Sequence, residues 1–171
     1  MINSIKDRLD KLDSELEEVI QKMKDSSKSL HNKPKEKWSP VQVLNHLCTS
    51  EQGTVNYLKK KVQSKDVPSS GIRGFFASRL LSRALKNRKK KYRAPKVLGE
   101  MPDKPDFEKV QDEYLKVRKE LRSVLDRFDK KKARKAYFKH PIAGKLNIYQ
   151  TLSFLENHFE RHKEQIYERL S

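Results

Sequence analysis

The sequence has 171 residues and a net charge of +17, with 37% charged and 35% hydrophobic residues. This length suits a single domain over 1–171, and the composition favours helices with heavily charged outer faces. The lone Cys48 excludes an internal disulfide, and the lack of a long apolar run excludes a transmembrane helix, so we expect a cytoplasmic protein.

Different signals mark the first two predicted helices. From Ile2 to Met23, apolar residues recur at alternating spacings of three and four, which is typical of a bundle helix. The second helix is predicted to begin at Ser39 and to run to about Lys61. Its start signal is a serine at the N-cap, a proline at the first helical position and Gln42 at the third.

A strongly basic insertion at about 64–104 separates the second and third helices. Between Lys59 and Lys96 there are fourteen Lys or Arg residues and one acid, Asp66, so this segment holds +13 of the net charge. Its middle part, Ile72–Arg93, is predicted to form a short extra helix between breaks rich in proline and glycine. The densest cations in it are Lys86, Arg88, Lys89, Lys90, Lys91 and Arg93.

The third and fourth long helices are again marked by apolar stripes, and the fourth also by a cap. The third is predicted to start near Asp106, with a stripe that extends to Phe128. The fourth is predicted to open at Asn147, with Gln150 completing a capping pair, and to continue to Leu170.

These four segments predict an all-α protein built as a four-helix bundle, because no segment shows the alternation typical of strands. The connection between the second and third helices, roughly 40 residues, is long enough for a crossover that makes these helices parallel neighbours. A further basic run at 130–135 is expected to be a loop.

Three histidines lie at the edges of the apolar helix faces. His158 and His162 are one turn apart, which places two ring nitrogens close enough to bind one divalent metal ion, and His46 offers a third imidazole. Three neutral nitrogen ligands with an open position are the usual plan of a catalytic zinc or nickel site. The alternative is that each is a partly exposed surface residue, which is the interpretation we adopt for His31.

The segments around these histidines resemble the DinB-like superfamily, which includes the YfiT-type metal-dependent hydrolases. Residues 38–47, WSPVQVLNHL, are similar to the opening of the family and its first metal histidine. Residues 140–147, HPIAGKLN, are similar to the lead into its last helix, and residues 153–166 end in its H-x-x-x-H-x-x-Q-I pattern. Order and spacing agree over nearly the whole chain, with the basic insertion covered least.

The resemblance implies a bundle of up-down-down-up order that holds a divalent metal ion, zinc or nickel, through His46, His158 and His162. Relatives in this family include hydrolases and transferases that use low-molecular-weight thiols. The resemblance therefore implies a metal-dependent hydrolase or thiol S-transferase that acts on a small-molecule substrate. In either enzyme, the cation would make a bound water or thiol nucleophilic near neutral pH.

Two further residues are weaker catalytic candidates. Glu51 lies at the centre of the apolar face of the second helix, where it could orient a ligand histidine, act as a base, or pair with a buried Arg or Tyr. His140 could support the site or contact a substrate, or it could anchor the turn before the last helix. Cys48 points away from His46 and is interpreted as a thiol within the core.

Two other functions compete with a metal enzyme, and a homodimer is a further prediction. The Lys59–Lys96 segment predicts binding to nucleic acid or another anionic surface through phosphate contacts that weaken with salt. Ile72–Arg93 could instead contact a membrane surface, because its phenylalanines and leucines oppose arginines. We prefer the interpretation that its apolar side chains cover the open end of the bundle: Phe75, Phe76, Leu80 and Leu81.

Overall fold

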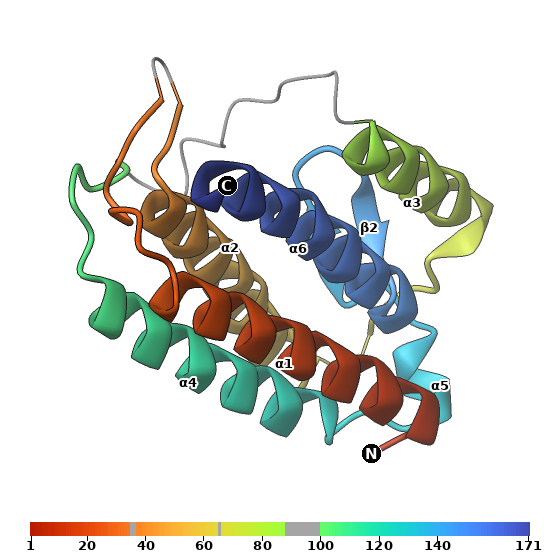
Figure 1. Cartoon of the computed structure of the whole chain (residues 1–171). Helices are drawn as coiled ribbons and strands as arrows, with labels where there is room; N and C mark the ends of the chain where they lie inside the picture. The colour runs from red at the N-terminus through yellow and green to blue at the C-terminus, as the bar shows by residue number, and fades with distance from the viewer. Residues whose placement is uncertain (35–36, 65, 88–99) are drawn as a thin grey trace.

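Long helices make up most of the chain in the computed structural model, which describes residues 1–34, 37–64, 66–87 and 100–171 (Figure 1). The prediction of a mainly helical protein is confirmed, whereas the expectation of no strands is wrong. The elements are α1 (Asn3–Lys24), α2 (Pro40–Lys61), α3 (Gly71–Lys86), α4 (Phe107–Leu125), α5 (Lys130–Ala133), β1 (Phe138–His140), β2 (Gly144–Leu146) and α6 (Ile148–Leu170).

The two helices that carry the histidines begin at reciprocal caps. At the start of α2, the Ser39 hydroxyl accepts a hydrogen bond from the backbone N–H of Gln42. The side-chain carbonyl oxygen of Gln42 in turn accepts one from the backbone N–H of Ser39. Asn147 and Gln150 make the same exchange at the start of α6, at 2.9 Å in each direction. Each exchange satisfies N–H groups that have no partner inside the helix, so both predicted starts are confirmed.

The other two long helices follow their predicted stripes with one difference. The apolar positions of α1 from Ile5 to Met23 are buried, and Asp106 caps α4 by accepting a hydrogen bond from the Lys109 N–H. The predicted stripe of α4 extends to Phe128, but the helix ends at Leu125. Phe128 is nevertheless 2% exposed, so it packs into the core from the turn after the helix.

The four long helices share one hydrophobic core. α2 contacts α4 and α6, and α1 also contacts both of them (Figure 1). The predicted neighbours, the second and third long helices, are therefore in contact as α2 and α4, while the up-down-down-up order stays a prediction. Among the residues that the structure describes, none of the helices combines the length and apolarity needed to cross a membrane.

The extra helix α3 differs from the expectation in length and orientation. It ends at Lys86, and the rest of the segment predicted to be helical, 88–93, lies outside the described residues. Leu81 is buried, but Phe75, Phe76 and Leu80 are 50%, 65% and 68% exposed. The preferred interpretation, in which all four side chains cover the bundle, is therefore wrong for three of them.

Small residues explain this orientation of α3. Gly74 and Ser78 are buried on the side that contacts α6 and β2, and a Cβ atom at Gly74 would lie 3.0 Å from the Lys145 carbonyl oxygen. Close approach of the helix backbone thus requires small side chains on the inner face. The larger apolar side chains are left on the outer face.

A short hairpin and a one-turn helix connect α4 to α6. β1 and β2 pair antiparallel, with Phe138 opposite Leu146 and His140 opposite Gly144, whose φ of +70° favours glycine. The basic run predicted to be a loop contains α5, whose first turn is capped by Asp129. Strands of three residues are too short to produce a recognisable alternation, which is why they were not predicted.

Candidate metal centre

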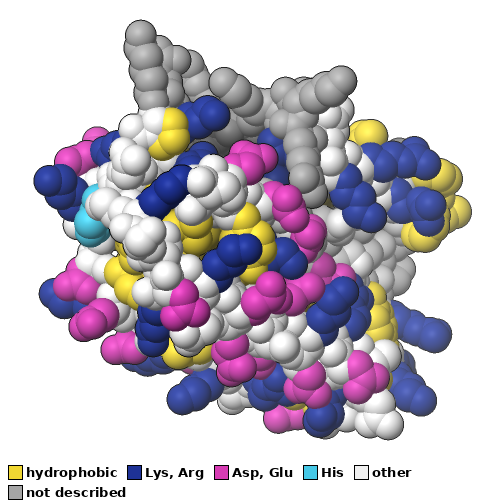
Figure 2. Space-filling view, in the orientation of Figure 1, with side chains coloured by type: hydrophobic (Ala, Val, Ile, Leu, Met, Phe, Trp, Pro, Cys, Tyr) yellow, Lys and Arg dark blue, Asp and Glu magenta, His cyan; other side chains and the backbone are white. Residues whose placement is uncertain are grey.

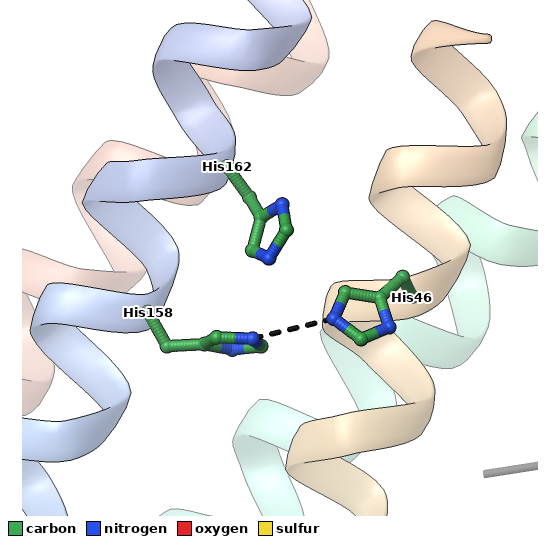
Figure 3. Close-up of side chains that lie close together, drawn as sticks. All are labelled: His46, His158 and His162. Atoms are coloured by element: carbon green, nitrogen blue, oxygen red, sulfur yellow. Dashed lines mark hydrogen bonds between the residues drawn. The ribbon is translucent and has the colours of Figure 1, made fainter. Parts of the chain in front are cut away.

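Three histidines from α2 and α6 converge on one point between the helices. His46 lies on α2, and His158 and His162 lie one turn apart on α6, with all three rings directed toward one another (Figure 3). His46 is 5% exposed, His162 is 9% exposed, and His158 is half-buried. The prediction that these residues come together is confirmed.

The distances among the three imidazoles suit a single ion. The Nε2 atoms of His46 and His158 are 3.3 Å apart, and one ligand nitrogen from each histidine lies within 4.8 Å of the others. Nitrogens that bind zinc at about 2.0–2.1 Å in tetrahedral geometry are about 3.4 Å apart. Small side-chain rotations would therefore suffice to place all three nitrogens around one cation.

Gln165 orients one of these rings. Its Oε1 atom lies 2.9 Å from Nδ1 of His162, so with the amide oxygen facing the ring, Nδ1 donates the hydrogen bond. The proton of the neutral imidazole is then on Nδ1, and the lone pair of Nε2 is available to a metal ion. Metal-binding histidines in proteins are commonly held in this way.

The electrostatic environment keeps the three imidazoles neutral. Burial lowers the pKa of His46 to about 4 and the pKa of His162 to about 3. Burial, together with the neighbouring His162 and His46, lowers the pKa of His158 well below its ordinary value. Near pH 7 all three rings therefore offer lone pairs rather than charged N–H groups, as metal binding requires.

Aromatic rings pack against two of the imidazoles. The ring centroids of Trp38 and His46 are 5.0 Å apart. Phe154 stacks on His158, with centroids 5.4 Å apart and ring planes at 25°. Trp38 was part of the resemblance, but the contact of Phe154 was missed, because a phenylalanine one turn before a histidine looks like any other apolar position of the stripe.

His140 anchors the hairpin turn and also approaches the site. Its Nδ1 atom accepts hydrogen bonds from the backbone N–H groups of Ile142 and Ala143, at 3.2 and 3.1 Å, so the proton of the neutral ring is on Nε2. Burial lowers the pKa of His140 to about 4. The ring packs on Phe154, the same phenylalanine that stacks on His158. The anchoring interpretation matches these contacts, and a catalytic role stays a prediction.

Glu51 belongs to a buried charged group between α2 and α4. Its Oε1 atom lies 2.7 Å from Nε of Arg118, within ion-pair distance but not aligned for a hydrogen bond, and its Oε2 atom accepts a hydrogen bond from the Tyr114 hydroxyl at 3.1 Å. Burial raises the pKa of Glu51, and Arg118 and Tyr114 oppose this shift. Of the three alternatives for Glu51, pairing with a buried Arg and Tyr is the one these contacts match.

Cys48 and His31 lie outside the cluster. Cys48 is a buried cysteine whose thiol pKa is raised to about 12 by burial, so it is poorly reactive near neutral pH. His31 is exposed, as expected. Two open surface cavities of the described residues, of about 730 and 570 Å³, are lined by residues near Met1 and near Met23, and neither of these linings includes a histidine.

The predicted anionic-partner site lies mostly beyond the described residues. Of its six cations, Lys86 is described and exposed, whereas Arg88, Lys89, Lys90, Lys91 and Arg93 fall in 88–99. Binding of nucleic acid, binding of a small-molecule substrate and formation of a homodimer all stay predictions.

The fold and the cluster together define a mostly helical protein with a three-histidine group that could hold a metal ion. A family model described as the DinB superfamily matches residues 8–166, and the chain therefore belongs to the DinB superfamily. The resemblance drawn from the sequence is thereby confirmed. Neither the curated proteins nor the solved structures gave a significant match.

Proposed function

We propose that the protein is a metal-dependent enzyme that holds one divalent ion, zinc or nickel, through His46, His158 and His162. The observation that carries this proposal is the convergence of three neutral imidazoles whose ligand nitrogens lie within 4.8 Å of one another. Three protein ligands leave at least one coordination position for a water or a substrate, which is the arrangement of catalytic rather than structural sites. Both metals suit an all-imidazole ligand set.

The reaction that we propose is hydrolysis or thiol transfer on a small molecule. A bound cation would supply Lewis acidity, which lowers the pKa of a water or a low-molecular-weight thiol at the open position. Gln165 holds the His162 ring in the orientation in which its Nε2 atom would bind the cation. Trp38 and Phe154 pack on His46 and His158 and limit the access of water from those sides. A cytoplasmic location, where low-molecular-weight thiols are reduced, is part of the same proposal.

Elemental analysis of the purified chain tests the metal site. We expect about one zinc or nickel ion per chain, and we expect His158→Ala to lose it, because two remaining imidazoles bind too weakly. His31→Ala is the matched control, because His31 is exposed and lies outside the cluster. No bound metal after incubation with zinc and with nickel, or metal retained by His158→Ala, would overturn the proposal.

The loaded protein then separates the two reactions. Consumption of an electrophile only when a low-molecular-weight thiol is present indicates transfer, whereas turnover of an ester or amide without thiol indicates hydrolysis. The alternative function, polyanion binding through the Lys59–Lys96 segment, predicts retention on nucleic acid that weakens steeply with salt and does not depend on metal.

A further inference from the structure

The outer face of α3 exposes large apolar side chains. Ile72 is 77% exposed, and Phe75, Phe76 and Leu80 are at least half exposed. Among the described residues, five large hydrophobic side chains are at least half exposed, and four of them belong to this one helix. We call these four side chains the α3 apolar patch. A fifth, Ile142, lies in the turn of the hairpin that α3 contacts. Apolar surface gathered in this way usually marks an interaction site.

Polar contacts on the other face fix this orientation. Arg161 of α6 donates hydrogen bonds to the carbonyl oxygens of Leu85 and Asn87 at the end of α3, at 3.0 and 2.9 Å. Asn157 of α6 donates one to the Ser82 hydroxyl at 3.4 Å. α3 is therefore attached to α6 through its inner face, and the patch points away from the core of the protein.

Cations lie on the same outer face as the patch, so the expectation that the phenylalanines and leucines of this segment oppose the arginines is wrong for those of the patch. α3 contains four Lys or Arg residues and no Asp or Glu in its sixteen residues. Arg79, Arg83 and Lys86 are exposed, and at 100° per residue they fall on the side of the patch rather than on the side of the buried Leu81. The Arg79 guanidinium lies 5.6 Å from the centroid of the Phe75 ring. Figure 2 shows hydrophobic and basic side chains side by side over the region of α3.

We propose that α3 docks on the surface of an anionic lipid bilayer. The α3 apolar patch would enter the boundary between headgroups and acyl chains, and Arg79, Arg83 and Lys86 would bind lipid phosphates. Interfacial helices combine these two features, and each cation near an anionic leaflet adds to the attraction. The long stems of arginine and lysine allow their charges to stay at the headgroups while neighbouring side chains insert.

Charge and shape favour a bilayer over other partners. A second copy of the chain would bring a net charge of +17 against +17, which opposes association through this basic face. Single-stranded nucleic acid is bound by stacking on aromatic rings along a groove, but Ile72 and Leu80 have no ring and the patch lies on the convex side of a helix. This proposal does not rest on the metal site, because the two share no residue.

Co-sedimentation of the full chain with vesicles tests the docking. We expect binding to vesicles of equal parts phosphatidylglycerol and phosphatidylcholine, and little binding to phosphatidylcholine alone. The double variant Phe75→Gln/Phe76→Gln should lower the partition coefficient at least about tenfold, because two inserted rings are removed. Both side chains are exposed, so the fold should persist, and circular dichroism checks that it does.

A matched pair of charge variants separates docking at α3 from general attraction to an anionic surface. Arg79→Ala/Arg83→Ala removes two charges beside the patch, whereas Lys130→Ala/Lys131→Ala removes two exposed charges from α5. Docking through α3 predicts a larger loss of vesicle binding for the arginine pair. Equal losses for the two pairs would overturn the proposal.

Three further outcomes would also overturn it. The first is that the protein does not bind the anionic vesicles at low salt, and the second is that the double phenylalanine variant binds them as well as the unchanged protein. The third is that the protein binds single-stranded DNA but not vesicles, and that the double phenylalanine variant abolishes this DNA binding. The last of these would assign the patch to nucleic acid. A Phe76→Trp variant adds a direct reading of insertion, because an indole that enters the bilayer shifts its emission to the blue.

Discussion

Gln165 is the residue outside the histidine triad whose effect on the metal can be tested most directly. Its amide oxygen accepts the hydrogen bond from Nδ1 of His162 and so sets the direction of that ring. We expect Gln165→Leu to lower the affinity for zinc by about 10- to 100-fold while the stability changes little. Titration against a competing chelator measures the affinity.

Gln21→Leu is the matched control for this change, because Gln21 is an exposed glutamine in the last turn of α1 whose side chain donates a hydrogen bond to Asp25. It should bind zinc like the unchanged protein. An unaltered affinity in Gln165→Leu would mean that the His162 ring is oriented by its surroundings in the core alone.

At the scale of elements, the contact between α2 and α4 contains a buried ion pair. Arg118 is 3% exposed, faces Glu51 at 2.7 Å and also reaches Asp13 of α1 at 3.5 Å. We expect Arg118→Leu to lower the free energy of unfolding by about 3–5 kcal/mol, because it leaves a carboxyl group buried without its cation. Urea unfolding followed by circular dichroism measures the change.

The double variant Glu51→Leu/Arg118→Leu distinguishes a paired charge from a packing effect. It removes both charges and should be more stable than Arg118→Leu alone, since neither group is then left without its partner. If the double variant is instead the less stable of the two, Arg118 acts mainly by filling space against Tyr114 and Phe159, over whose rings its guanidinium lies.

An element could be predicted from the sequence when the residues that define it lie close together along the chain. The starts of α2 and α6 were located because each cap is made by residues three positions apart. The orientation of α3 was not predictable in this way, because it depends on contacts of Gly74 and Ser78 with elements far along the chain. The rule that apolar residues face inward failed there.

The residues of the candidate site also differ in whether the sequence alone could locate them. The pair His158 and His162 and the third ligand His46 could be found from spacing and from the family pattern. The partner of Glu51 could not, since Arg118 lies 67 positions away and any buried cation would have satisfied the same expectation. The contact between His140 and Phe154 is likewise visible only in the folded structure, because the hairpin brings His140 to the ring that stacks on His158.

For the whole molecule, the buried histidines make the stability of the metal-free protein depend on pH. The pKa values of His46 and His140 are lowered from 6.5 to about 4, so the unfolded chain takes up protons first as the pH falls. Their contribution is fully present above pH 6.5 and decreases toward pH 4. We expect the free energy of unfolding to fall by up to about 1.4 kcal/mol per pH unit for each histidine.

Urea titrations of chelator-treated protein across this pH range measure the slope. The variant His140→Gln, which cannot be protonated there, should reduce the slope by the contribution of one histidine, whatever its effect on stability at neutral pH. A slope that is unchanged in this variant would show that His140 is protonated equally easily in the folded and unfolded chain.

The burial of Cys48 has a practical consequence for spectroscopy. Its thiol is enclosed in the core, with a pKa raised to about 12, and it is the only cysteine of the chain. Maleimide and methanethiosulfonate reagents attack thiolates, so the native cysteine should stay unmodified while the protein is folded. One new surface cysteine, for example Ile142→Cys, would then carry a nitroxide or a fluorophore at a single known position. The native cysteine therefore does not have to be replaced before a label is attached. Distances from the labelled hairpin to a bound paramagnetic ion or to a lipid surface could be measured directly.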